Sequence, residues 1–172
     1  MKVATLPPQK FLKEALRYDA ATGKLYWRKR PLHHFSTEGQ QRRWNRRYPG
    51  KEAFATADPV WGYLRGRIGK QSFLAHRVVW KMVRDTEPPP IVDHRDRNPK
   101  NNRDKNLREA TNTQNCLNGK RSGVSFDSGH QKWRARVTVG GKRVCLGRYG
   151  TEREALEARR ARAVVEYGEF AP

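Results

Sequence analysis

The chain has 172 residues, 35% of them hydrophobic and 31% charged, which leaves room for one medium domain or two small ones with much exposed surface. Its 37 lysines and arginines against 17 acidic residues give a formal charge of +20, which favours nucleic acid over an acidic membrane as partner. Two cysteines without a CxxC pair disfavour a zinc ribbon and a disulfide framework. No stretch has a signal core or transmembrane length, so we expect a cytoplasmic protein.

The first predicted elements are short. Pro7-Pro8 followed by QKFLKEALRY predicts a helix, and a turn over residues 21–24 leads into a strand at Leu25–Trp27. Residues 28–59 are rich in arginine and lack a sustained period, so we expect a long surface loop with a strand or two. The expected apolar face of the helix consists of Phe11, Leu12, Ala15 and Leu16.

A hairpin, a helix and a strand are predicted next. Residues 61–74 alternate on either side of a Gly69-Lys70 turn, which is typical of a hairpin. Residues 76–84 predict a helix, and the apolar run 91–94 predicts a strand that ends in two reactive side chains. The helix is expected to bury Val79, Trp80 and Val83.

A polar stretch separates this part from the rest of the chain. Residues 95–106 predict a loop, and residues 107–117 can form a helix. The basic, glycine-bounded segment Gly119–Gly123 marks a linker. We therefore expect two modules, over residues 1–118 and 122–172.

The second module is predicted to be a small sheet covered by a helix. Strand candidates occupy residues 124–126, 133–139 and 143–146, with a tight turn at Gly140-Gly141. Thr151 and Glu154 form a capping box at the start of a helix. The fold class is then α+β, with three antiparallel strands packed on one helix in this module. The small residues expected to face the sheet are Ala155, Ala158, Ala161 and Val165.

The dipeptide Asp93-His94 places two different chemistries at a strand end. Hydrolysis of a phosphodiester needs a base for the attacking water and a cation for the developing charge. Side chains alternate along a strand, so the carboxylate and the imidazole can do separate work. Asn106 follows His94 by twelve residues, and Asn115 follows Asp93 by twenty-two. Without this later spacing, a structural loop would be the better interpretation.

The run IVDHRDRNPKNNRDKNLREATNTQN resembles the ββα-metal motif of HNH endonucleases, in the branch of phage and intron homing nickases, with its core over about residues 88–118. The resemblance implies that Asp93 and Asn115 ligate one divalent ion, Mg²⁺ or Mn²⁺. It also implies that His94 is the general base and that Asn106 braces the loop carrying His94. Oxygen ligands suit such hard ions, and a histidine neutral near pH 7 can accept a proton. The family usually has glycine where Arg97 stands, so either the turn differs or Asn98 takes the left-handed position.

Other polar residues have two interpretations each. His76 could orient phosphate or the motif, or make a structural hydrogen bond at a helix start. His33-His34 lies in a polar stretch and is expected to be solvated. Arg103 could hold the loop or touch a DNA phosphate, and for Asn101 and Asn102 we favour a role in loop structure.

The segment from Gly123 to the C-terminus resembles the plant ethylene-response-factor-type DNA-binding domain, through its Trp-Arg-Ala-Arg, Leu-Gly-Arg-Tyr and Gly-Glu-Phe-Ala motifs. Arginine here replaces the aromatic residue usual in mid-helix. Arginines that share one face of a sheet can read guanine or clamp phosphate, although a merely solvated face has the same pattern. The predicted DNA-binding residues of this module are Arg134, Arg136, Arg143 and Arg148.

Together these patterns predict a metal-dependent endonuclease of the HNH type that cuts double-stranded DNA, with site selectivity of the homing kind. No protein partner is predicted. The alternative from another class is a DNA-binding regulator with a degenerate nuclease motif, against which the intact Asp93, His94 and Asn115 count. An RNA-associated basic protein is disfavoured because no RNA-stacking motif is present.

Overall fold

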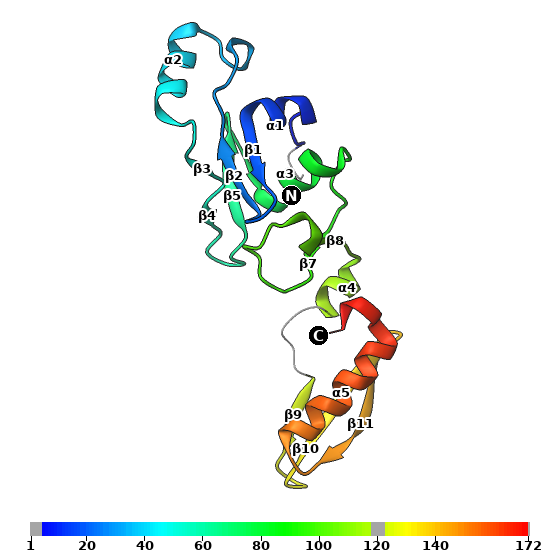
Figure 1. Ribbon diagram of the computed structural model, residues 1–172. Coiled ribbons are helices and arrows are strands. Elements are labelled where there is room, and N and C mark those ends of the chain that lie inside the picture. Colours follow the sequence, from blue (N-terminus) through cyan, green and yellow to red (C-terminus); the bar gives the residue numbers. More distant parts are fainter. Residues whose placement is uncertain (1–4, 118–122, 172) are drawn as a thin grey trace. The chain divides into compact units, whose positions relative to one another are not determined.

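The computed structural model describes residues 5–117 and 123–171, which form two compact units, Met1–Glu109 and Ala110–Pro172 (Figure 1). The linker predicted at Gly119–Gly123 falls almost wholly outside the described residues, so the division into modules 1–118 and 122–172 stays a prediction. No helix in the described part of the chain is both long and apolar enough to cross a membrane.

The first unit begins with helix α1 (Gln9–Ala15) and the sheet β1-β2-β3, formed by Leu16–Asp19, Lys24–Trp27 and Glu52–Ala53. The predicted helix is confirmed but shorter, because Leu16 begins β1 and pairs with Trp27. Leu12, Ala15 and Leu16 are buried in the core of this unit, as the apolar pattern predicted, while Phe11 is partly buried against it.

The predicted loop over residues 28–59 is wrong in one respect. It contains the turn η1 (Leu32–His34) and the ten-residue helix α2 (Glu38–Arg47) besides the short strands β3 and β4 (Thr56–Ala57). Thr37 caps α2 by accepting a hydrogen bond from the Gln40 backbone N–H. The Thr-x-x-Gln spacing is a capping signature, and reading it would have predicted the helix.

The predicted hairpin is confirmed as β5 (Leu64–Ile68) and β6 (Gln71–Leu74), joined in a sheet of order β4-β5-β6. Helix α3 (Ala75–Arg84) follows directly. It buries Val79 and Trp80 as expected, but Val83 is 43% exposed. The buried stripe instead runs along the positions i, i+3, i+4 and i+7 from the first helical residue, namely Ala75, Val78, Val79 and Met82.

Strand β7 (Val92–His94) confirms the predicted apolar strand and pairs antiparallel with β8 (Leu107–Glu109). The expectation of one helix over 107–117 is therefore wrong in its first half. Leu107 pairs with His94 and is 1% exposed, so pairing with β7 decides the conformation there over local propensity. Helix α4 is confined to Asn112–Leu117, in the second unit.

The second unit contains the predicted three antiparallel strands, in the order β11-β10-β9, and helix α5 packs on them. The capping box of Thr151 and Glu154 is present. The predicted apolar face is only partly right, since Val165 is 77% exposed and Ala163 is buried with Ala155. The elements are β9 (Val124–Asp127), β10 (Lys132–Val139), β11 (Lys142–Tyr149), α5 (Glu152–Tyr167) and the turn η3 (Gly168–Phe170).

Candidate active site

The acidic residue at the end of β7 is held by an arginine from the facing strand. The register of β7 and β8 places Asp93 opposite Arg108, and Arg108 Nε donates to Asp93 Oδ2 over 2.8 Å. The two side chains are only 6% and 4% exposed. Removal of either partner of such a buried charge pair destabilises the folded state, because the remaining charge would lie uncompensated in a low-dielectric environment. A metal ion at Asp93 would share the carboxylate with Arg108.

The histidine beside it is held by an asparagine from the polar loop. His94 is 3% exposed, and its Nε2 lies 3.1 Å from Oδ1 of Asn102, which is 1% exposed. An amide oxygen can only accept, so Nε2 of the neutral ring carries the proton and Nδ1 carries the basic lone pair. Burial lowers the pKa of His94, and the hydrogen bond to Asn102 opposes that shift. The imidazole is thus neutral near pH 7, as a general base requires.

The loop after His94 is tied together by one side chain. Asn106, in the turn η2 (Asp104–Asn106), donates from Nδ2 to Asp96 Oδ1 and to the Asn101 carbonyl, over 2.9 and 2.8 Å. Its own Oδ1 accepts from the Asp96 backbone N–H, and its carbonyl accepts from the Arg95 N–H. These hydrogen bonds fix the backbone on both sides of the turn.

The turn that directly follows His94 has its left-handed residue at Arg97, with φ of 62°. The backbone N–H of Arg97 donates to the His94 carbonyl. The alternative that Asn98 takes this conformation is wrong. Arginine has a steric cost there that glycine would not have, so the surrounding hydrogen bonds must impose the conformation.

A second histidine lies against the first. His76, on α3, is 4% exposed, and its ring centroid lies 5.2 Å from those of both His94 and Tyr63. Burial lowers the pKa of His76 to about 3, so this ring is neutral. Its Nδ1 is buried and has no hydrogen-bond partner among the described residues, which rules against the structural hydrogen bond through Nδ1 that a helix start could have supplied.

The remaining predicted residues of this site occupy different environments. Arg103 donates from Nε to the Ala21 carbonyl over 2.6 Å and from Nη1 to Asn101 Oδ1 over 3.1 Å, so it joins two loops of the first unit. Asn115 lies on α4 of the second unit, where its N–H donates to the Thr111 carbonyl. The structure thus brings Asp93, His94 and Asn106 together in one unit, and the pairing of Asp93 with Asn115 stays a prediction.

The four arginines predicted to bind DNA lie on β10 and β11. Arg134 pairs with Arg148 across the two strands, and Arg143 pairs with Thr138. Asp127 holds the first pair, since it accepts from Arg148 Nε over 3.1 Å and lies 3.7 Å from Arg134 Nη1. Ala135 and Val137 alternate with Arg134 and Arg136 along β10 and are buried. Trp133 lies on the same face of the strand as these two core residues and contacts Phe126. Arg143 and Arg148 are exposed, and Arg134 and Arg136 are partly exposed.

Sequence reasoning missed two residues that hold this site, Arg108 and Asn102. Arg108 lies opposite Asp93 across the strands β7 and β8. Only the pairing of these strands reveals that the two charges meet. Asn102 was assigned to loop structure alone, because nothing in the sequence shows that the loop folds back onto His94.

Residues 73–117 match the model of a protein family described as HNH endonuclease. The matched segment contains His76, Asp93, His94, Asn106 and Asn115. Comparison with curated proteins and with solved structures found no match. The family match supports an HNH nuclease, and hence a nuclease that acts on DNA.

Proposed function

We propose that the chain is a metal-dependent DNA endonuclease of the homing type, which hydrolyses phosphodiester bonds at selected sites. The observation that supports it most strongly is the buried, oriented pair Asp93 and His94 within the segment that matches the HNH family. A DNA-binding regulator would not need a neutral histidine whose tautomer is set by a fully buried asparagine.

In the proposed reaction His94 takes the proton of the attacking water through Nδ1. Asn102 keeps the proton on Nε2, and Asn106 keeps the loop after His94 in place. His76 contributes a neutral ring beside His94, because a charged imidazole at this place would oppose proton transfer to His94.

Asp93 and Asn115 would hold one divalent ion, Mg²⁺ or Mn²⁺. Carboxylate and amide oxygens are the donors such ions take, and the carboxylate charge suits a dication. When bound, the ion would stabilise the negative charge that develops on the phosphate. Arg108 would hold the Asp93 carboxylate in place through its hydrogen bond to Oδ2.

Site selection belongs, in this proposal, to an ethylene-response-factor-type module over residues 122–172. Its sheet would enter the major groove with the arginines of β10 and β11, while the module over residues 1–118 cuts. Arg103 would support the loop of the site rather than touch DNA, since its guanidinium already joins Ala21 and Asn101.

The test is cleavage of supercoiled plasmid with Mg²⁺ or Mn²⁺ and with EDTA, using the full chain and Asp93→Asn. The wild type should cut only with metal, and the variant should not cut while its affinity for duplex stays within about twofold, because basic residues supply most binding. Wild-type protein that binds duplex but never cuts would favour the regulator. A variant that cuts at the normal rate would remove Asp93 from the site.

A further inference from the structure

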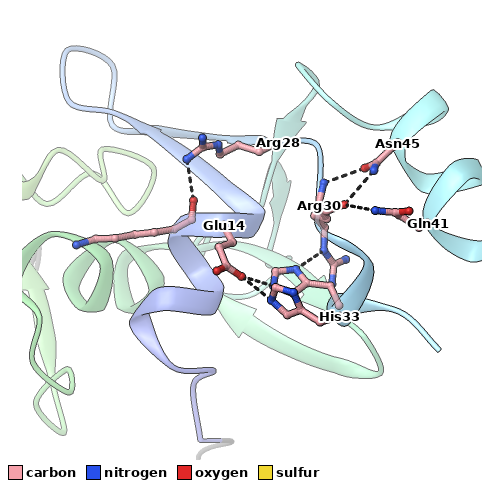
Figure 2. A network of polar contacts seen from close by, with 8 residues as sticks. Glu14, Arg28, Arg30, His33, Gln41 and Asn45 are labelled. Atoms are coloured by element: carbon pink, nitrogen blue, oxygen red, sulfur yellow. Dashed lines mark hydrogen bonds and ion pairs between the residues drawn. The ribbon is translucent and has the colours of Figure 1, made fainter. Parts of the chain in front are cut away.

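A basic cleft of about 820 Å³ lies on the first unit, between α1, the segment before η1, and α2 (Figure 2). It shares no lining residue with the site of Asp93 and His94. Five lysines and arginines line it against a single acid, Glu14. Four of these cations are exposed, and the fifth, Arg30, is 7% exposed. The five are Lys10, Lys13, Arg28, Lys29 and Arg30.

Arg30 is anchored at this cleft by its backbone. Its N–H donates to Asn45 Oδ1 over 2.8 Å, and its carbonyl accepts from Gln41 Nε2 and Asn45 Nδ2 over 3.1 and 2.9 Å (Figure 2). Both partners lie on α2, the helix that sequence reasoning did not predict. The position of Arg30 therefore follows from the docking of α2.

The guanidinium of Arg30 lies among aromatic rings. Its central carbon is 4.6 Å from the ring centroid of Phe35, 4.8 Å from that of Trp44 and 5.4 Å from that of Phe11. Among the described residues no carboxylate lies within ion-pair distance of it, and its terminal nitrogens donate no hydrogen bond. A buried cation without an anionic partner is costly to desolvate, so this arrangement suits an anion supplied from outside.

A metal site is the competing interpretation, because Glu14, His33 and His34 bring three ligand atoms within 4.8 Å of one another. His33 Nε2 and His34 Nε2 lie 2.9 and 2.8 Å from Glu14 Oε2. His34 is not solvated as the sequence suggested, since its side chain is fully buried and its ring stacks on Phe11 at 3.9 Å.

The tautomer of His34 disfavours a metal site formed by Glu14, His33 and His34. Arg30 Nε lies 3.1 Å from His34 Nδ1, and a guanidinium nitrogen can only donate. Nδ1 is therefore the acceptor, and Nε2 of the neutral ring carries the proton that it donates to Glu14. A metal-binding histidine needs the opposite arrangement, with its lone pair on the metal and a proton on the other nitrogen. Glu14 thus holds the two histidines, and His34 in turn orients the guanidinium of Arg30.

We infer that this cleft binds backbone phosphates of DNA, as a second contact of the nuclease unit away from the cleavage site. The inference rests on the proposed function for the identity of the polyanion. Five cations exceed what one phosphate ion can neutralise, whereas a strand passing along the cleft presents several phosphates. Guanidinium geometry also matches phosphate oxygens.

The test compares two double variants of the full chain in binding to a fluorescent duplex of arbitrary sequence, in EDTA so that nothing is cut. Lys10→Gln/Lys13→Gln removes two charges of the cleft, and Lys51→Gln/Lys70→Gln removes two exposed charges elsewhere on the same unit. The logarithm of the affinity falls linearly with the logarithm of the salt concentration, and we call the steepness of this line the salt slope. For every phosphate that is no longer neutralised, the salt slope should fall by about 0.9, and the affinity at 0.1 M salt should fall by about eightfold. The cleft variant should therefore lose about eightfold or more, and the control less than about twofold.

Arg30→Met tests the buried cation itself. The thioether side chain keeps apolar contact with the aromatic rings, and circular dichroism at 222 nm checks that the variant is folded. The Nε–Hε signal of Arg30 in an NMR spectrum of the wild type should shift on addition of duplex, and Arg30→Met should lose affinity as the cleft variant does. Inorganic phosphate at the same phosphate concentration should leave that signal nearly unmoved.

Four results would overturn the inference. Equal losses in the cleft and control variants would show only a general charge effect. Saturation of the Arg30 signal by inorganic phosphate would indicate a site for a small phosphate ligand. Stoichiometric Zn²⁺ binding that Glu14→Gln abolishes would establish the metal site instead. A wild type that binds no duplex would overturn the proposed function as well, whereas equal losses would leave it standing.

Discussion

The polar residues around Asp93 and His94 in the first unit differ in burial from the arginines on the sheet of the second unit. In the first unit Asp93 and His94 of the candidate site are buried, and each is held by a specific partner: Asp93 by Arg108, and His94 by Asn102. In the second unit the arginines of β10 and β11 stay at the surface, where Asp127 alone among the described residues bridges two of them. Burial strengthens each electrostatic interaction and fixes its geometry, whereas exposed charges remain mobile and screened by salt.

This difference separates cleavage from affinity. A buried, hydrogen-bonded histidine can act on one water molecule at one place, so a small displacement of its imidazole should lower the rate of cleavage strongly. Under the proposed function, exposed arginines would contribute to affinity through the number of phosphates they neutralise, so the loss of one arginine should have a modest effect on affinity that depends on salt. Substitutions at the buried site of Asp93 and His94 should therefore change the rate of cleavage, and substitutions of the arginines on β10 and β11 should change binding.

The largest effect should come from His94→Ala. Removal of a general base typically costs about 10²–10⁴-fold in rate, and DNA affinity should stay unchanged because the residue is 3% exposed. Single-turnover cleavage of a plasmid measures the rate, and anisotropy measures the affinity. His130→Ala, at an exposed histidine of the second unit, is the matched control and should cut normally. Normal cutting by His94→Ala would mean that another group, His76 foremost, is the base.

A smaller loss is expected for Asn102→Ala. The variant keeps His94 but removes the acceptor at Nε2, so the ring can rotate and change tautomer. A misplacement on the order of 1 Å can cost about 10²-fold, and the loss should appear in kcat with KM nearly constant. Asn98→Ala, in the exposed part of the same loop, controls for loop damage. Equal loss in both variants, or a loss confined to KM, would contradict the positioning role of Asn102.

These buried contacts also mark how far the sequence could lead. The hairpin at residues 64–74, strand β7 and the sheet of the second unit follow from alternation and turn residues, which are local signals. Leu107–Glu109 was expected to be helical because its pairing with β7 spans the whole polar loop and leaves no local trace. The roles of Arg108 and Asn102 depend on the same long-range pairing. Helix α2 was predictable from Thr37 and Gln40.

An effect of intermediate size is expected on binding from Arg134→Ala/Arg148→Ala. If each arginine neutralises one phosphate, the salt slope should fall by about 0.9 per arginine removed, or about eightfold in affinity each at 0.1 M salt. The rate of cleavage at saturating protein should stay normal, which sets this variant apart from His94→Ala. Arg153→Ala/Arg160→Ala, at exposed positions of α5, is the control. Binding that is unchanged in the strand variant would remove this pair from the DNA-binding surface.

The smallest effect should come from Asp127→Asn, and it concerns acid stability. The bond to Arg148, followed by the contact with His130, lowers the pKa of Asp127 to about 2. A carboxyl whose pKa is depressed on folding stabilises the folded state above its ordinary pKa, near 3.8, and loses that contribution as the pH falls toward 2. The amide signals of β9–β11 should therefore report unfolding that depends on pH between about 4 and 2 in the wild type. This dependence should be weaker in Asp127→Asn, and only slightly so, because the ion pairs are exposed to solvent.

Asp85→Asn is a suitable control for this prediction, since asparagine tolerates the left-handed backbone there, with φ of 55°. If the two variants show the same acid dependence as the wild type, then Asp127 does not hold Arg134 and Arg148 in solution. The two arginines would then be less restrained than their ion pairs with Asp127 imply.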